Sequence, residues 1–443
     1  MAARVTCPGH LPDPTRPCST PACRGTNRIA PVPTPPEPSH IHAPPDSPGP
    51  AAFDPLGLAY DDFLPAAKAA TGLSAPAATD AYHAIFRRGI TDHPRVPVHL
   101  GPVATVQREE SPEGEVVKFT QRVAAAGGAG PNPVSTPGAA LRVAQFKTLE
   151  TESVLIPMIG RRGLRNYTLC LSSQVGCAMG CGFCETAQMG LIRHLTPGEI
   201  VGQWYTATHV LKHHVRNIVF MGMGEPLDNY DNLIAAIGVL IDHHGAAMAV
   251  SKITVSTVGR LDGLAKLREQ IHKTGWHRLN LAVSLNAPND EIRSKIMPVN
   301  RAMPMADLRR MLADWPIYGG GKLCLEYVLI PGVNDAREHA AELAEFVGPI
   351  NRAYQQKTGH NTARVMLNLI PYNPRRNSPW PAPREEDVDA FLGWVHEAGI
   401  YAKRRRTKGR DLMGACGQLG SASIRGRKPV AAMQDVTTDK AAG

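Results

Sequence analysis

Three cysteines stand close together in the run GCAMGCGFCETAQMG: Cys177, Cys181 and Cys184. At this Cys-x3-Cys-x2-Cys spacing, three thiolates can bind three irons of a cubane cluster and leave the fourth iron without a protein ligand. A structural metal site normally completes its coordination shell, whereas a catalytic site keeps one position open. The spacing therefore predicts an iron–sulfur cluster whose open iron binds a small molecule that accepts an electron.

A zinc knuckle is the alternative for the same cysteines, and it needs a fourth ligand nearby. His194, a short way after Cys184, is the close candidate for that ligand. The cluster interpretation is favoured by Phe183, because an aromatic residue just before the third cysteine makes the run resemble the signature of radical S-adenosylmethionine (SAM) enzymes.

The bulk composition narrows the class of protein. The chain has 443 residues, enough for two or three domains, and a formal net charge of +9. The positive charge favours a polyanionic partner such as nucleic acid. No apolar stretch approaches the roughly 18 residues that span a bilayer, and MAARVTCPGH at the start lacks the apolar run of a signal peptide. We therefore expect no membrane association.

Cysteine usage indicates the redox environment. The chain has nine cysteines, an odd number, and four of them fall between Cys170 and Cys184. Clustered cysteines indicate metal or redox chemistry in a reducing compartment, not a disulfide scaffold. The expected location is the cytoplasm.

The elements that must position these cysteines begin after a proline-rich start. Residues 1–50 hold fourteen of the 39 prolines and are predicted to be a disordered extension, in which Cys7, Cys18 and Cys23 are too irregularly spaced to indicate a metal site. Residues 51–125 are predicted to be a small domain with two helices, around AYDDFLPAAKAATGL and ATDAYHAIFRRGI, and a strand at GEVVKFTQRVA. The other predicted parts are a linker at 126–150, the main domain at 151–400, a segment that contains Cys416 at 401–420 and a disordered tail at 421–443.

The main domain alternates strands with helices. A strand is expected at TESVLIPM, and then six strands alternate with helix-like segments: YTLCLSS, NIVFMGMGEP, KITVSTVG, RLNLAVSLNAP, KLCLEYVLIPG and RVMLNLIPYNP. Buried, β-branched strands of this kind indicate a parallel sheet covered by helices. Polar and glycine residues gather after the strands, in GMGEP, SLNAP and IPYNP, and the cysteine run also follows a strand. Because ligands bind at the carboxyl ends of parallel strands, the motif and the architecture indicate the same site.

A basic run follows the last of these strands. YAKRRRTKGR at 401–410 carries six basic side chains, and Cys416 lies just beyond it in GACGQLG. A basic run is commonly a solvated face, and phosphate binding is the alternative. The run is also expected to lower the pKa of nearby thiols.

Several stretches, in the right order, resemble the RlmN/Cfr family of radical SAM RNA adenine methyltransferases: TLCLSSQVGCAMGCGFCETAQMG, MGMGEPLDN, VSLNAPNDEIRSKIMPVN, YVLIPGVND, LNLIPYNP and ACGQL. The resemblance implies an α/β fold, a partial (β/α)6 radical SAM barrel with a small N-terminal helical accessory domain at 51–125 that binds RNA. It also implies that residues 401–420 carry a catalytic redox cysteine beside an RNA cleft, which makes phosphate binding the better interpretation of the basic run. It implies a [4Fe–4S] cluster and SAM as cofactors. The implied substrate is 23S rRNA, with tRNA as a second one, and TAQMG is closer to the branch that methylates adenine C2.

The resemblance also implies roles for individual residues. Cys177, Cys181 and Cys184 hold the cluster, Cys416 carries the methyl group, and Cys170 is its resolving partner. Glu152 matches the position of a proton acceptor. SAM is expected to contact Gly224, Glu225, Ser256, Ser284, Leu285, Asn286 and Asn373.

The implied chemistry explains why two outlying thiols are needed. Adenine C2 is electron-poor, so a polar methyl transfer has no driving force there. In the family, Cys416 is methylated first, its methyl group loses a hydrogen to a deoxyadenosyl radical, and the carbon radical adds to the ring. Cys170 then attacks the Cys416 sulfur, which frees the base and leaves a disulfide. The partners implied are an electron donor such as flavodoxin or ferredoxin and a thiol reductant.

Three departures from the family pattern stand out. Asn286 replaces a usual histidine, Glu185 replaces a small residue after the last cluster cysteine, and residues 51–125 diverge. The alternatives that remain are methylation of adenine C8, a radical SAM enzyme acting on protein or a small molecule, and an RNA-binding paralogue without catalysis.

Overall fold

The computed structural model describes residues 53–125, 148–160, 163–316 and 323–420. The predicted disorder of 1–50 and 421–443, with Cys7, Cys18 and Cys23, lies outside these residues, as does most of the predicted linker. Within the described residues no helix combines the length and the apolar character needed to cross a membrane.

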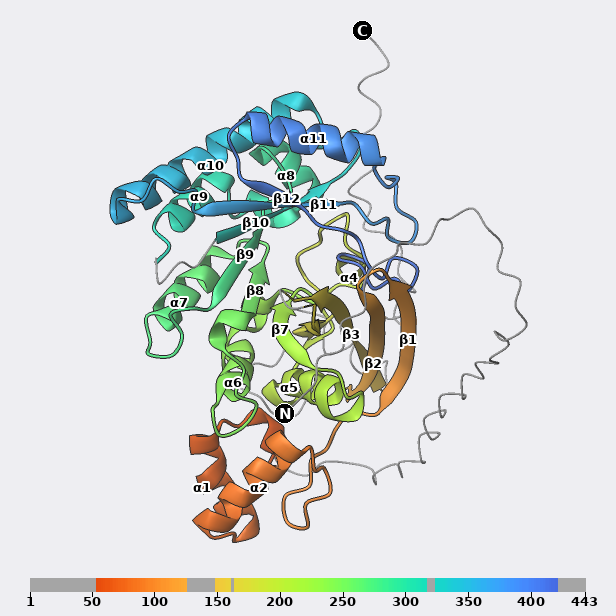
Figure 1. The fold of residues 1–443 in the computed structure, drawn as a ribbon, viewed down its shortest axis with the longest axis vertical. Coiled ribbons are helices and arrows are strands. Elements are labelled where there is room, and N and C mark those ends of the chain that lie inside the picture. Colours follow the sequence, from red (N-terminus) through yellow and green to blue (C-terminus); the bar gives the residue numbers. More distant parts are fainter. Residues whose placement is uncertain (1–52, 126–147, 161–162, 317–322, 421–443) are drawn as a thin grey trace, which may run out of the picture. The chain divides into compact units, whose positions relative to one another are not determined.

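One ten-stranded sheet organises the fold, in the order β1-β2-β3-β4-β7-β8-β9-β10-β11-β12 (Figure 1). The six predicted strands are all present and pair in parallel. They are β4 (Arg165–Cys170), β7 (Val215–Phe220), β8 (Ile253–Thr257), β9 (Asn280–Ser284), β10 (Leu323–Leu329) and β11 (Val365–Pro371). The prediction of a partial α/β barrel is confirmed.

Helices alternate with these strands. They are α5 (Pro197–Tyr205), α6 (Tyr230–Ile241), α7 (Leu261–Ile271), α8 (Asp290–Ile296), α9 (Met305–Ala313), α10 (Arg337–Thr358) and α11 (Glu385–Glu397). Their packing fixes which face of each strand reaches the site. On β10, the Tyr327 ring stacks on Phe391 of α11 at 5.5 Å, so the alternate residues Glu326 and Val328 face the barrel interior.

Two strands of the ten-stranded sheet were not predicted. The edge strand β12 (Ala402–Arg404) pairs with β11 although it lies within the basic run. At the other edge, β1 (Val103–Ser111) pairs antiparallel with β2 (Gly114–Ala124), and β2 pairs with β3 (Thr148–Ile159). Because β3 also pairs antiparallel with β4, these three strands continue the barrel sheet.

The region predicted as an accessory domain is therefore built from two parts. Its helices, α1 (Tyr60–Thr71) and α2 (Ala75–Arg88), contact the loop after α6. There Asp242 accepts hydrogen bonds from the Tyr60 backbone N–H at 2.6 Å and from the Tyr82 hydroxyl at 3.1 Å. Its strands β1 and β2 belong to the main sheet, which continues from β2 into β3. The domain boundary at residue 125 stays a prediction, and the sheet extends across it.

Candidate functional site

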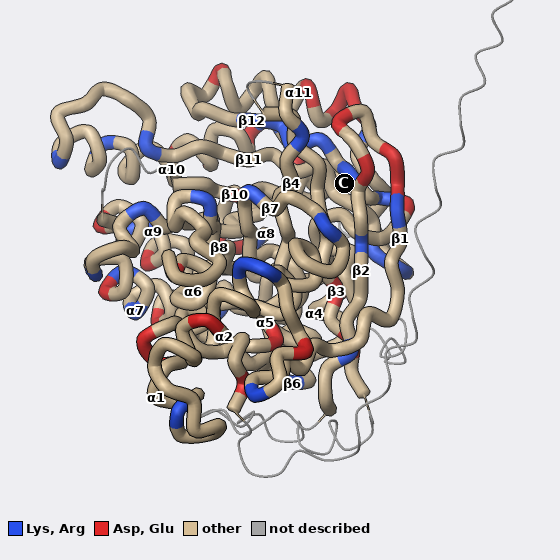
Figure 2. Tube along the Cα trace, turned by 60° about the horizontal axis from the view of Figure 1, so that its bottom comes forward, with Lys and Arg blue, Asp and Glu red and all other residues tan. Residues whose placement is uncertain are grey.

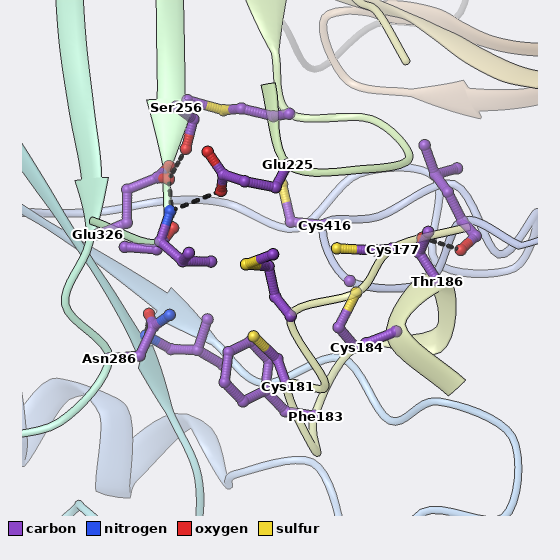
Figure 3. A pocket seen from close by; sticks show the side chains of 18 of the residues that line it. Cys177, Cys181, Phe183, Cys184, Thr186, Glu225, Ser256, Asn286, Glu326 and Cys416 are labelled. Carbon is purple, nitrogen blue, oxygen red and sulfur yellow. Dashed lines mark hydrogen bonds between the residues drawn. The ribbon is translucent and has the colours of Figure 1, made fainter. Parts of the chain in front are cut away.

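A cavity with an empty volume of about 970 Å³ opens at the carboxyl ends of the parallel strands (Figure 3). Its lining joins the cysteine loop to the ends of five strands and to the C-terminal segment. The predicted site residues found there are Cys177, Cys181, Cys184, Gly224, Glu225, Ser256, Ser284, Asn286, Asn373 and Cys416. The structure thus brings together ten of the thirteen residues singled out in the sequence.

The cysteine loop is held in place by backbone contacts on both sides. Its first cysteine, Cys177, donates its N–H to Gly190 O at 3.1 Å, and Gly182 donates to Ile296 O, at the end of α8, at 2.9 Å. Gly176 has a φ of +75°, and a Cβ there would lie 1.9 Å from Gly190 O, so only glycine fits. These contacts turn all three thiols toward one cavity.

The three thiols fit a cluster better than a single ion. Among the described residues, the ligand atoms of Asp242, His243 and His244 fall within 4.8 Å of one another, whereas the sulfurs of the three cysteines do not form such a group. Burial, and the neighbouring Cys181, raise the pKa of Cys177 well above its usual range. A bound group of positive irons supplies the charge that lets buried thiols ionise together.

His194, the fourth ligand that a zinc knuckle needs, is engaged elsewhere. It lies on the short strand β6 (Arg193–His194), with its Nδ1 at 3.0 Å from Gln174 Nε2. His194 is not among the described residues that line the cavity. The arrangement therefore favours three ligands and an open position.

Glu225 places a buried carboxylate in the cavity. It is 2 % exposed and accepts hydrogen bonds from Leu227 N at 3.0 Å and Val258 N at 2.9 Å. Burial raises its pKa to about 7 despite these donors. No ion pair among the described residues includes Glu225, so this carboxylate can accept the ammonium group of a ligand.

Glu326 is a second buried carboxylate in the cavity, and the sequence reasoning missed it. Its Oε2 accepts from Ser256 Oγ at 2.8 Å and from Ser284 Oγ at 3.3 Å, so it fixes two of the predicted SAM contacts (Figure 3). A signal was present: Glu326 is the one charged residue in the apolar strand LCLEYVL. A charge inside a buried strand indicates a site.

The segment after β9 contains Leu285 and Asn286, two of the predicted SAM contacts. Asn286 has a φ of +58°, a conformation that asparagine tolerates, and its side chain accepts a hydrogen bond from Val328 N at 3.0 Å. Leu285 is fully buried and does not line the cavity. Its N–H donates to Glu326 O and its carbonyl accepts from the Arg293 guanidinium, so its backbone groups are already bound within the protein.

Cys416 lines a second cavity as well, and Cys170 lines that one. Burial raises the pKa of Cys170 to about 12, with the Cys416 thiol as the next cause. Burial also raises the pKa of Cys416, while the Arg405 guanidinium opposes that rise. The basic run therefore acts in the expected direction through Arg405, but burial outweighs it. Both thiols are free, as is every cysteine among the described residues, so the expected disulfide is not present in this structure.

Glu152 lies elsewhere. It is 3 % exposed, forms an ion pair with Lys118 at 2.7 Å, and accepts from Gly420 N at 3.1 Å. It lines neither of the two cavities. The structure therefore connects Glu152 with the backbone of the C-terminal segment.

Glu185 connects the cysteine loop with the same segment. It begins the short helix α4 (Glu185–Gln188), and its N–H donates to Gly417 O at 2.7 Å. Its carboxylate accepts from Arg376 N at 3.0 Å. The acidic departure after the third cysteine thus has a structural role next to Cys416.

Comparisons with known proteins find a matching family, similar sequences and a similar structure. The model of the family described as "Radical SAM superfamily" matches residues 171–344. A "Probable dual-specificity RNA methyltransferase RlmN 1" from Protochlamydia amoebophila is 43% identical over 281 residues, 63% of this chain and 72% of the relative. The "Dual-specificity RNA methyltransferase RlmN" of Lawsonia intracellularis is 42% identical over 274 residues, 60% of this chain and 71% of the relative. The crystal structure of a radical SAM methyltransferase from Sphaerobacter thermophilus superposes with a TM-score of 0.65 at 30% identity and covers 83% of this chain and 98% of that one.

Proposed function

Because this chain belongs to the RlmN family of radical SAM RNA methyltransferases, we propose that it methylates carbon 2 of an adenine in 23S rRNA, with tRNA as a second substrate. The names of its relatives, which describe dual-specificity RNA methyltransferases, support two kinds of RNA. The TAQMG run supports the C2 position through its resemblance to that branch.

One observation carries the proposal. A single cavity is lined by the three loop cysteines, the buried carboxylate of Glu225 and the thiol of Cys416, and Cys416 also lines the cavity that contains Cys170. A methyl carrier therefore lies within reach both of a radical source and of a second thiol.

The family uses a [4Fe–4S] cluster and SAM. When bound, these groups supply the methyl group and the deoxyadenosyl radical. We assign Cys177, Cys181 and Cys184 to the cluster, and Glu225 to the SAM ammonium. The remaining SAM contacts are assigned to Gly224, Ser256, Ser284, Leu285, Asn286 and Asn373.

The chain's own residues perform the other steps. Cys416 takes a methyl group on its sulfur, and the methylene carbon formed from it becomes bonded to adenine C2. This adduct would then lose the C2 proton and its one unpaired electron, for which an oxidised iron–sulfur cluster held by the three loop cysteines would be the acceptor, so that a closed-shell thioether remains. The thiolate of Cys170 then attacks the Cys416 sulfur, so that an S–S bond forms, the S–C bond breaks, and the product carbon takes the electron pair and a proton. Glu152 keeps its assignment as acceptor of the ring proton on resemblance alone. A thiol reductant resets the disulfide, and flavodoxin or ferredoxin supplies the electron; both requirements suit the cytoplasm.

The test is mass spectrometry of digested RNA from a deletion strain complemented with the wild-type gene or with Cys416→Ala. The wild-type gene should restore 2-methyladenosine in 23S rRNA and tRNA, and Cys416→Ala should not. Appearance of 8-methyladenosine instead would show the other regiochemistry, and no change in either base would refute an RNA methyltransferase.

A further inference from the structure

Residues 409–420, here called the Cys416 segment, contain no helix or strand. Their backbone groups must therefore find partners outside the segment or in tight turns. Three of these partners are charged side chains on β1, β2 and β3, the strands that continue the barrel sheet.

Lys118 on β2 holds the middle of the Cys416 segment. Its Nζ donates to Met413 O at 3.1 Å and to Leu412 O at 3.3 Å. The same Nζ lies 2.7 Å from Glu152 Oε2, which in turn accepts from Gly420 N. Because Lys118 is only 5 % exposed, its ammonium group contacts the Cys416 segment and the buried carboxylate of Glu152, and it has little contact with solvent.

Glu109 on β1 binds the start of the Cys416 segment through its backbone N–H groups, whereas Lys118 binds backbone carbonyls. Its carboxylate accepts from Gly409 N at 3.1 Å, Asp411 N at 3.2 Å and Leu412 N at 3.3 Å. Several N–H groups that converge on one anion form a specific binding arrangement for it. Met413 follows with a φ of +51°, a conformation rare outside glycine, which these flanking contacts hold in place.

We propose that Lys118 and Glu109 are positioning residues that fix the methyl-carrying Cys416 between the two cavities. The Glu109 carboxylate binds backbone N–H groups at the start of the Cys416 segment, and the Lys118 ammonium binds the carbonyls that follow. Together the two side chains fix the position of the segment and the direction in which its chain runs. This inference rests on the proposed function only in the role of Cys416. The strands β1 and β2 then position a catalytic cysteine, in addition to any contact that they make with RNA.

The test is hydrogen–deuterium exchange of the cluster-loaded protein, read on peptides that cover the Cys416 segment, together with the rate of alkylation of Cys416. Lys118→Met and Glu109→Gln should each raise amide exchange in the segment about tenfold, as expected for the loss of hydrogen bonds to a charged group. Lys118→Arg, which keeps a cationic donor, should restore most of the protection.

Lys357→Met is the matched control. Lys357 also donates to a backbone carbonyl, Ala313 O at 3.0 Å, and contacts a carboxylate, Asp314 at 3.3 Å, but it lies on α10. Its loss should leave exchange in the Cys416 segment unchanged.

Two results would overturn the inference. One is wild-type exchange and alkylation in Glu109→Gln, a half-buried site whose variant should fold even if Lys118→Met does not. The other is full protection in Lys118→Met/Glu152→Gln, which would mean that Lys118 serves only to neutralise Glu152. Both readouts are independent of RNA methylation, so a wild-type protein that makes no methyladenosine would refute the proposed function and leave this test intact.

Discussion

At the scale of single residues, the site is built from groups that burial drives toward their neutral forms. Burial raises the pKa values of Glu225, Cys170 and Cys416. Arg405 is the cation that opposes this shift at the two thiols, and it lies 3.9 Å from Glu326. Charged ligands therefore supply much of the charge balance of this site when they bind.

Glu225 should make the stability of the cluster-free protein fall as the pH rises from about 4.5 to about 7. Its pKa is raised from 4.5 to about 7 in the folded state, so its contribution is complete below pH 4.5 and is lost as the pH passes through about 7. The loss should approach about 3 kcal/mol relative to Glu225→Gln. Urea unfolding of both proteins across this range measures it, and parallel pH curves would contradict the buried carboxylate.

Cys170→Ala should leave RNA covalently attached to Cys416, because no second thiol can release the adduct. A band that survives denaturing electrophoresis and disappears after RNase treatment would show it. Cys416→Ala should form no such band, yet should still cleave SAM reductively. Full RNA methylation by Cys416→Ala would exclude the thioether route.

The residues that could be predicted are those whose role is encoded locally. The cysteine loop and GMGEP follow strand ends directly, so spacing and strand order placed them in one cavity. Lys118 could not be assigned, because its role depends on partners far away in the sequence: Lys118 binds Leu412, 294 positions away. Glu326 differs, because a charge within an apolar strand was a local signal that could have been used. Leu285 follows β9 directly, and its side chain is buried in the core.

At the scale of elements, Asp242 joins the first two helices to the barrel. Its carboxylate accepts from Tyr60 N, the Tyr82 hydroxyl and His244 N, and the His244 ring stacks on Tyr60 at 3.9 Å. Arg87 of α2 also donates to His243 O and His244 O, and His209 contacts Phe86 O at 3.1 Å. Asp242 is therefore one of several contacts that dock the helix pair on the barrel, and we expect this docking to loosen before the barrel unfolds.

Asp242→Ala should raise amide exchange in α1 and α2 and weaken their docking by about 1–3 kcal/mol, because it leaves buried donors without an acceptor. The exchange of β8 to β11 should not change. Asp262→Ala, which breaks an exposed pair with Arg260, is the control and should have little effect. Equal loss of protection in α2 and in the barrel strands would show that they unfold together.

The elements that the sequence predicts well are those with buried, apolar strands, such as ITVST in β8. The sequence of β1, VATVQREES, has an exposed run at its centre and little apolar alternation, so its strand arises from pairing with β2. The edge strand β12 has three residues, two of them basic, and depends in the same way on β11. Tertiary pairing overrode local preference at both edges.

At the scale of the whole molecule, the net charge of +9 is only partly available to RNA. Arg404 of the basic run pairs with Glu385 and Asp389 of α11, and Lys408 pairs with Glu113. Acidic and basic positions stand side by side near β12 and α11 in Figure 2. Among the described residues of the run, Arg406 is exposed, lines the Cys170 cavity and enters no ion pair, which makes it the best placed for a phosphate.

Arg406→Gln should weaken RNA binding and lower the slope of log K against log salt by about 0.7 to 1, the release of one counterion. Filter binding of a substrate RNA hairpin across a salt series measures that slope. Lys403→Gln changes the same charge in the same run but lies outside the two cavities, and it should change the slope less. Equal slopes for all three proteins would mean that the run does not contact the RNA backbone.

The contacts of the Cys416 segment also set an order of assembly. Lys118 and Leu412 lie 294 positions apart, so their contact closes a very long loop and should form late in folding. The start of the cysteine loop, in contrast, is fixed by the short-range bond from Cys177 to Gly190, whereas its end depends on the bond from Glu185 N to Gly417 O. We therefore expect the three thiols to be accessible to iron and sulfide until the Cys416 segment completes one wall of the cavity.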